Sequence, residues 1–522
     1  MSIDLYLKQI RYDATDPSLE DAVDPDGVII ADGWERTRLV TLANGQLPGP
    51  PIVVYKGQEV IIFVENDLEG RETTIHWHGF DQRGTPWMDG VPYINQCLIN
   101  GLQRFKYSFI ADEAGTFWWH SHVGSQRSDG LYGALIVKER EELLENQHIM
   151  IVQEWNHDGD ADYIRENIGA NFDERVKWPG FQTLDNLNLG PYRAHSVVIN
   201  GRARFSDDSV TIDTPLTRFM VEEGDVYRFR VITAAAFYPI RISVDNHQLE
   251  LIASDGNNLK SQPCDSFIIY PGQRFDFLLH ANQEPGIYWI RALLAVKPFS
   301  RAPLGEAILK YKGAPGRYPQ TSQNCTAGCY MANCPYDYKS YQPYPNTSCI
   351  SVNKFRGAAG LPSTPQYEAG NFRQFILNFG FVEGRASVNG LVFKSPTVNS
   401  YTQPKDVPEP CDEVCTDEIV CECFHVIKFP GGAVVQIVLT NLVKSLAGTY
   451  SEPHPIHIHG HHFHVVKIGF PTYNETNGEI IAGTPDIVCE KKMARLTGTA
   501  AHRNGRIPLG RRTYRASLDD PL

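Results

Sequence analysis

The chain has 522 residues, which exceeds what one hydrophobic core usually supports, so roughly two to four domains are expected. Hydrophobic residues make up 42% and charged residues 21%, as in ordinary globular proteins. The net charge of −13 argues against nucleic-acid binding, which needs a basic face. The longest apolar runs have only the length of strands, so we expect no transmembrane helix.

Short runs rich in Val, Ile, Phe and Tyr recur along the chain and are bounded by Gly, Pro, Asn and Asp. They predict strands at 52–55, 59–66, 105–109 and 226–232, among others. Helical periodicity over long stretches is scarce. The sequence therefore predicts an all-β fold made of β-sandwiches.

An internal repeat organises these strands. Its first half is a glycine turn, a strand, a variable loop and a second strand, and it occurs at 56–79, 223–244 and 430–460. Its second half occurs at 115–122 and 286–293. A third copy of this second half does not follow His459, and the chain becomes rich in Lys and Arg after Cys489. The repeat predicts two complete domains and a third that stops early, which would leave an unpaired sheet edge.

We divide the chain accordingly. The prediction is a first domain at 28–142, a second at 143–312, a Pro/Cys-rich connection at 313–370, a partial third domain at 371–489 and a basic tail outside the fold at 490–522.

Cysteines indicate the compartment. Eight of the eleven form two clusters: Cys325, Cys329, Cys334 and Cys349, then Cys411, Cys415, Cys421 and Cys423. Such clustering favours disulfides in an extracellular protein, with zinc as the alternative, although neither cluster contains a paired C-x-x-C. Sequons at Asn324, Asn346 and Asn474 fit secretion. Residues 1–10 show no apolar signal core, so we expect a secreted protein whose signal peptide is not visible in this sequence.

Seven of the seventeen histidines fall into three motifs: His76-Trp-His78, His120-Ser-His122 and His454-Pro-Ile-His457-Ile-His459. On a strand, side chains at i and i+2 share a face, so each His-x-His pair presents two imidazoles together. Neutral imidazole binds copper, zinc, iron or nickel. A lone pair of this kind is more often incidental, but these pairs occupy equivalent points of the repeat. The second copy has other residues there: Ile240, Ile242, Arg291 and Leu293. We infer a joint metal site of the first and third domains, with a structural second domain.

In this order the three motifs resemble three of the four copper motifs of the multicopper oxidases. The flanking stretches 82–92 and 131–137 resemble animal laccases, especially those of arthropods. The resemblance runs from about residue 39 to about residue 487. It implies three cupredoxin-like Greek-key β-sandwiches in tandem, the third incomplete here, with a trinuclear copper cluster between the first and the third.

The resemblance also implies a role for each motif residue. His76 and His457 match ligands of the type-2 copper, and His454 matches one ligand of the blue type-1 copper. The matches to the type-3 copper pair are His78, His120, His122 and His459. Asp89 matches an acidic residue that manages protons near the cluster during O₂ reduction; the alternative is a turn aspartate before Gly90.

The family's last motif, of the form His-Cys-His-x-x-x-His, is not found in this sequence. No cysteine is flanked by histidines, and Cys489 is followed by Glu490. The type-1 site would then be incomplete, because a blue copper needs two histidines and a cysteine thiolate. We therefore expect impaired catalysis by the chain as written.

The function implied is that of a laccase-like oxidoreductase, which oxidises diphenols or similar phenolic or metal-ion reductants and reduces O₂ to water. One alternative is a ferroxidase. Another, from a different class, is a non-catalytic copper-binding pseudoenzyme or truncated isoform. We expect Trp118 and Trp119 to lie in the core, and His461, His462 and His464 to be solvated or hydrogen-bonded rather than ligands. No oligomeric state is predicted.

Overall fold

The structure, a computed structural model, describes residues 2–10, 29–34, 38–142, 146–157, 181–183, 194–206, 211–297, 301–322, 328–334, 346–359, 369–382, 385–407, 421–441, 454–469, 472–473, 480–482 and 505–508. Over these residues the chain is almost entirely β, as predicted. Its described helices are short 3-10 turns: η2 (Pro86–Met88), η4 (Val352–Lys354) and η5 (Ala369–Asn371). None of the described helices has the length and apolar character needed to span a membrane.

The first sandwich consists of two four-stranded sheets, with the orders β2-β1-β4-β6 and β3-β8-β7-β5. Their strands are β1 (Ser2–Ile10), β2 (Val40–Ala43), β3 (Ile52–Tyr55), β4 (Glu59–Asn66), β5 (Ile75–His78), β6 (Gln103–Ile110), β7 (Gly115–Ser121) and β8 (Tyr132–Lys138). Every second side chain of β4 is buried, including Val60, Ile62 and Val64, as expected for a strand with one face on the core. β1 pairs in parallel with β4, so this sheet also uses residues before the predicted domain start at 28.

The second sandwich has sheets of six and seven strands, ordered β11-β9-β13-β18-β15-β16 and β12-β21-β19-β14-β17-β22-β23. Its strands are β9 (Gln147–Trp155), β11 (Ser196–Ile199), β12 (Arg218–Val221), β13 (Val226–Thr233), β14 (Ile240–Val244), β15 (Leu249–Ser254), β16 (Asn257–Cys264), β17 (Ser266–Ile269), β18 (Arg274–His280), β19 (Ile287–Leu294), β21 (Leu304–Tyr311), β22 (Cys329–Cys334) and β23 (Thr347–Ser351). A two-stranded ribbon joins β10 (Gln182–Thr183) to β20 (Val296–Lys297). The stretch predicted as a connection, 313–370, thus adds β22 and β23 to this domain.

The third sheet has the order β27-β26-β25-β24-β28-β32-β29. Its strands are β24 (Phe372–Val382), β25 (Arg385–Val388), β26 (Leu391–Phe393), β27 (Cys421–Cys423), β28 (Val434–Asn441), β29 (His464–Val465) and β32 (Gly505–Pro508), beside a ribbon of β30 (Thr472–Tyr473) and β31 (Ile480–Ala482). β32 comes from the stretch that we placed outside the fold. It pairs with the edge of β28 that faces away from β24, since an open strand edge offers unpaired backbone groups. The other domain limits stay a prediction.

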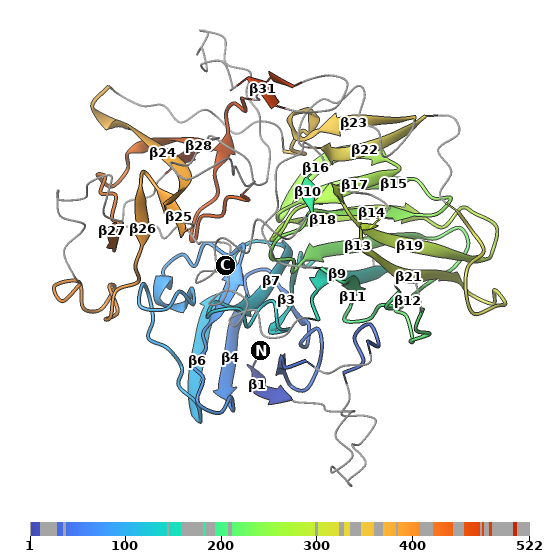
Figure 1. The fold of residues 1–522 in the computed structure, drawn as a ribbon, viewed down its shortest axis with the longest axis horizontal. Coiled ribbons are helices and arrows are strands. Elements are labelled where there is room, and N and C mark those ends of the chain that lie inside the picture. Colours follow the sequence, from blue (N-terminus) through green and yellow to red (C-terminus); the bar gives the residue numbers. More distant parts are fainter. Residues whose placement is uncertain are drawn as a thin grey trace.

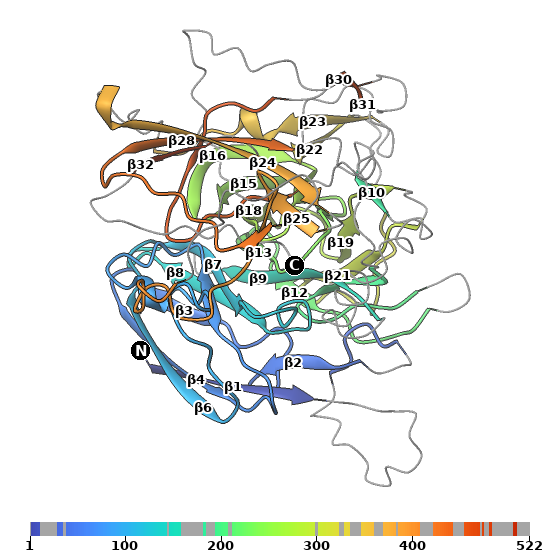
Figure 2. The ribbon, with the colours of Figure 1, turned by 60° about the vertical axis from the view of Figure 1, so that its left-hand side comes forward.

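The three groups of strands pack around a common centre (Figures 1 and 2). The first domain, in blue, lies below the green strands of the second and the orange strands of the third. The predicted strands at 52–55, 59–66, 105–109 and 226–232 all exist, as β3, β4, β6 and β13. The repeat is confirmed locally, since β5 pairs with β7 in the first domain as β14 pairs with β19 in the second.

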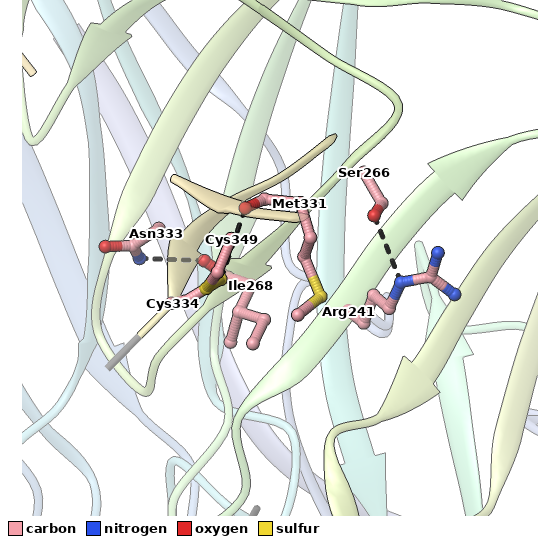
Figure 3. Close-up of a disulfide and its surroundings, with 7 residues drawn as sticks. All are labelled: Arg241, Ser266, Ile268, Met331, Asn333, Cys334 and Cys349. Atoms are coloured by element: carbon pink, nitrogen blue, oxygen red, sulfur yellow. Dashed lines mark hydrogen bonds between the residues drawn. A yellow bond between two sulfur atoms is a disulfide. The ribbon is translucent and has the colours of Figure 1, made fainter. Parts of the chain in front are cut away.

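A disulfide joins Cys334 on β22 to Cys349 on β23 (Figure 3). Next to it, Asn333 donates a hydrogen bond of 2.8 Å to the carbonyl oxygen of Ile268, which ties the bridge to the sheet. Cys329, Cys421 and Cys423 are disulfide-bonded as well, whereas Cys97 and Cys264 are free. For these residues, disulfides rather than zinc account for the cysteine clusters.

Candidate metal centre

Two neighbouring strands of the first domain carry the first two histidine motifs. His76 and His78 lie on β5, and His120 lies on β7 directly opposite His76 in the antiparallel register. All four residues of β5 are buried because they sit between the domain core and the adjoining domains. The corresponding positions of the second domain hold Ile240 and Ile242, which are buried in the hydrophobic core. The second copy therefore has core residues where the first has histidines.

The third motif approaches from a loop rather than from a strand. Residues 454–460 have no assigned strand, and the next strand, β29, begins at His464. The expectation that His457 and His459 share a strand face is therefore wrong. A turn ending in Gly460, whose φ is +69°, brings both rings to the first domain. A loop can do this because its backbone groups need not stay in the ladder of a sheet.

His76 lies at the middle of the cluster. Its ring centroid is 4.0 Å from that of His459 and 5.5 Å from that of His457. The distances to His78, His120 and His122 are 5.5, 5.3 and 5.7 Å. Six of the seven predicted ligands thus converge, from two domains. His454 is half-buried and belongs to none of the groups of three potential ligands found among the described residues.

Two such groups share His76. One is His76, His457 and His459, and the other is His76, His78 and His120; within each, one potential ligand atom per residue lies within 4.8 Å of the others. Nδ1 of His78 and Nε2 of His120 are 3.4 Å apart. Two nitrogens bound to one ion at about 2 Å can be no more than about 4 Å apart, so this separation suits a shared metal.

Hydrogen bonds determine which nitrogens face the centre. Nδ1 of His76 lies 2.7 Å from the carbonyl oxygen of Asp89, and Nδ1 of His120 lies 2.8 Å from that of Ser121. A carbonyl oxygen only accepts, so each Nδ1 carries the proton and each Nε2 keeps its lone pair. Nε2 of His76 is buried without a hydrogen-bond partner among the described residues. A buried lone pair of this kind fits a metal ion, so the donor set fits copper.

Burial also favours the metal-binding form of the rings. It lowers the pKa of His76, and it lowers the pKa of His78 and His120 further, with His457 and Arg127 respectively as the next causes. The imidazoles are therefore neutral, as ligands must be. Trp118, in the core as predicted along with Trp119, packs against His78 and His120 with centroid distances of 5.0 and 4.3 Å.

Asp89 joins the two halves of the cluster. It ends the short helix η2, and its carboxylate lies 3.1 Å from Nδ1 of His76 and 2.8 Å from Nδ1 of His459. Burial by itself raises the pKa of Asp89, but His459 and His76 outweigh it and hold the pKa well below its usual range. The structure thus places Asp89 against two proposed ligands, as an ionised acceptor, rather than in an isolated turn.

A second group of charged residues lies nearby. Nδ1 of His462 is 2.9 Å from Asp81, and Glu113 is 3.9 Å from Nε2 of the same ring. Arg83 contacts both acids, at 2.8 and 3.4 Å. The prediction that His462 is hydrogen-bonded is confirmed, and this network forms a contact between the first and third domains.

Sequence reasoning missed the contribution of the second domain. Arg274, at the start of β18, donates a 3.1 Å hydrogen bond from Nε to the carbonyl oxygen of Thr116 on β7. It is also among the charges that lower the pKa of His78, after burial and His457. No local pattern marks this contact, because Thr116 lies 158 residues away from Arg274 in the sequence.

Known proteins with a similar sequence are copper oxidases. Sequence profiles described as multicopper oxidase match residues 29–142, 146–314 and 392–486. Laccase-5 of Trametes villosa is 31% identical over 482 residues, which cover 89% of this chain and 80% of the relative. A laccase of Phlebia radiata is 31% identical over 464 residues, covering 87% and 78%.

Solved structures share the fold. Fet3p, a multicopper oxidase that functions in iron import, superimposes with a TM-score of 0.68 at 19% identity, covering 99% of this chain and 85% of that one. The laccase from Botrytis aclada gives 0.63 at 21% identity, covering 98% and 82%. These likenesses confirm the predicted cupredoxin-like architecture of three tandem domains. The chain therefore belongs to the multicopper oxidase family and is a laccase-like, copper-dependent oxidoreductase.

Proposed function

We propose that the histidine cluster holds copper and serves the oxidation of diphenols or similar small reductants, coupled to the four-electron reduction of O₂ to water. One observation carries this proposal. Histidines from the first and third domains converge on His76, in two groups that share this residue. A structural role would not require so many neutral imidazoles in one buried place, since isolated core histidines need only a hydrogen-bond partner.

The proposed ligands follow from these groups and from the family resemblance. We assign His76 and His457 to the type-2 copper, and four residues to the type-3 pair: His78, His120, His122 and His459. His76 and His457, the residues proposed for the type-2 copper, belong to the same group of potential ligands. The close approach of His78 to His120 supports a common copper ion for these two residues. His454 is proposed as a type-1 ligand on the resemblance alone.

Copper, when bound, supplies one-electron redox chemistry between Cu(I) and Cu(II). The chain's own residues position it. Nδ1 of His459 donates a hydrogen bond to the carboxylate of Asp89, and Nδ1 of His76 donates to the carbonyl oxygen of Asp89, which fixes the orientation of both rings. We assign Asp89 to proton management close to where O₂ is reduced, as the family resemblance implies, because its carboxylate lies 3.1 Å from Nδ1 of His76 and 2.8 Å from Nδ1 of His459.

The test is O₂ consumption by the purified chain, loaded with copper, with a simple diphenol as reductant and copper per chain measured on the same sample. Because the sequence lacks the His-Cys-His motif, we expect copper binding with only slow turnover, and we expect both to be lost in a His76→Ala/His457→Ala variant. The matched control is His280→Ala, which removes an exposed histidine of the second domain. Bound copper without turnover would support a copper-binding pseudoenzyme instead. A chain that retains no copper would overturn the ligand assignment.

We also propose that the protein acts outside the cell. The disulfide between Cys334 and Cys349 supports this, because such bonds persist in oxidising compartments. Asn346, in the sequon beside that disulfide, is exposed and can accept a glycan. Expression of the chain behind a secretory leader should yield a product whose mass falls after glycosidase treatment, and an Asn346→Gln variant should show a smaller fall. Identical masses before and after treatment would count against the proposal.

A further inference from the structure

Among the described residues, the second domain contributes no histidine to the cluster, but it places a buried arginine next to it. Arg274 is 4% exposed and opens β18, which lies against β7 of the first domain. We propose that Arg274 is a positioning residue of the copper centre. It holds together the strands that carry His78 and His120, and its positive charge beside these residues favours the binding of anionic ligands to the cluster. This inference rests on the proposed copper ligands.

The guanidinium of Arg274 contacts both strands that carry the histidines. Nε donates to the carbonyl oxygen of Thr116 at 3.1 Å, on the strand that carries His120. A Cβ at Gly79, the residue after His78, would lie only 2.5 Å from Nη2. The guanidinium therefore packs directly on the backbone of Gly79. One side chain thus contacts both histidine strands.

The turn before Arg274 packs on the ring of His78 itself. A Cβ at Gly272 would lie 3.4 Å from Cε1 of His78, an ordinary van der Waals distance, so this turn lies next to the ring with room for no more than a methyl group between them. Nη1 of Arg274 donates to the carbonyl oxygen of Gly272 at 3.3 Å and lies 3.1 Å from Asp255. These contacts hold the turn in place and hence restrain the orientation of the imidazole.

The positive charge of Arg274 lies close to His78, because its guanidinium packs on Gly79, the next residue. Arg274 is nearly fully buried, and water screens its field little there. Asp255 balances part of the charge. The neighbouring acid on β18, Asp276, is bound instead by Arg228 and Arg230, at 2.6 and 3.3 Å.

Two variants separate charge from packing. Arg274→Gln removes the cation, leaves Asp255 uncompensated and loses the forked donor. Arg274→Lys keeps the cation but not the fork, because lysine is a point charge on a flexible stem. The control is Arg291→Gln, which breaks an arginine–aspartate pair with Asp245 of 2.9 Å elsewhere in the second domain.

The measurement is the Kd of azide, followed by its absorption with the copper-loaded chains, with copper per chain determined alongside. We expect Arg274→Gln to weaken azide binding about tenfold, as loss of a nearby unit charge implies, and Arg274→Lys to restore most of it. Arg291→Gln should leave the Kd unchanged.

Unchanged azide binding in Arg274→Gln, with copper retained, would overturn the inference and leave the proposed function intact. Equal losses in Arg274→Gln and Arg274→Lys would overturn the role of the charge. If the unmodified chain retained no copper, the ligand assignment would fail and the inference with it. Should Arg274→Gln not fold, Asp255→Asn provides the test with the opposite sign: it leaves Arg274 uncompensated and should tighten azide binding, and weaker or unchanged binding would overturn the proposal.

Discussion

The carboxylate of Asp89 accepts a 2.8 Å hydrogen bond from Nδ1 of His459, although 370 residues separate the two in the sequence. The same carboxylate lies 3.1 Å from Nδ1 of His76. One ionised group thus orients a proposed ligand from each of two domains. Buried charges are stable only when paired, so this contact also holds the first and third domains together.

Replacing this carboxylate by an amide should impair the centre while preserving its shape. We expect Asp89→Asn to lower the rate of O₂ consumption about 10- to 100-fold, because an amide no longer stabilises the two Nδ1–H donors by charge. The rate and the copper content are measured on the same preparation. Asp67→Asn, at an exposed position, is the control and should behave like the unmodified chain. An active Asp89→Asn chain would leave Asp89 without a role in proton transfer.

The glycine after Asp89 has no room for a side chain. Gly90 has a φ of +90°, and a Cβ there would lie 2.1 Å from the carbonyl oxygen of Ile75, on the strand that carries His76. Gly90→Ala should therefore push Asp89 away from His76 and destabilise the fold by about 1–3 kcal/mol. Gly84→Ala is the matched control, since Gly84 also has a positive φ, of +79°, but no atom within 4 Å of the added Cβ. Denaturant unfolding should show the larger loss for Gly90→Ala; equal losses would attribute the effect to backbone strain alone.

Glu154 gives the chain a pH-dependent stability. Its Oε1 accepts hydrogen bonds from the amides of Ala236 and Phe237 at 2.7 and 3.0 Å, and its Oε2 is buried without a hydrogen-bond partner among the described residues. Burial raises the pKa of Glu154 from 4.5 to about 7. The folded chain thus holds this proton more tightly than the unfolded chain, and stability falls as pH rises from about 4.5 to about 7.

Glu154→Gln keeps the acceptor for both amides and removes the titration. We expect the variant to be more stable than the unmodified chain above pH 7, by up to ~3 kcal/mol, with the difference shrinking towards pH 5. Thermal unfolding at several pH values measures this. A difference that does not vary with pH would show that Glu154 is already charged in the folded chain.

The contact between His462 and Asp81 should titrate at higher pH than Glu154. The hydrogen bond to Asp81 raises the pKa of His462, with Glu113 adding to the effect and burial and Arg274 opposing it. A raised pKa in the folded chain contributes stability that is fully present below the unfolded value of about 6.5 and is lost as pH rises through the folded value.

We therefore expect His462→Gln to destabilise the copper-free chain at about pH 5.5 and to have little effect at about pH 9. The side chain is 39% exposed, so water screens the pair and the loss at low pH should stay near 0.5–1 kcal/mol. Asp81→Asn should reproduce the same pH profile. Loss of stability that is larger at high pH than at low pH would contradict this assignment.

The sequence by itself determined the β architecture and the identity of the histidine motifs. Alternation along the strand specified β3 and β4 locally, since a strand needs only its own residues to present one face to the core. The repeat also marked the first and third domains as the source of ligands, because Ile240 and Ile242 replace histidines in the second.

Only the tertiary structure decided how these parts meet. A turn at Gly460, rather than a strand, brings in His457 and His459. Asp89 bridges the first and third domains, and Arg274 reaches the centre from the second domain. The sequence also did not reveal β32, because these four residues of a basic stretch join the sheet through backbone pairing with β28. Such contacts link residues far apart in the chain and depend on backbone groups and charge placement, which leave no periodic pattern in the sequence.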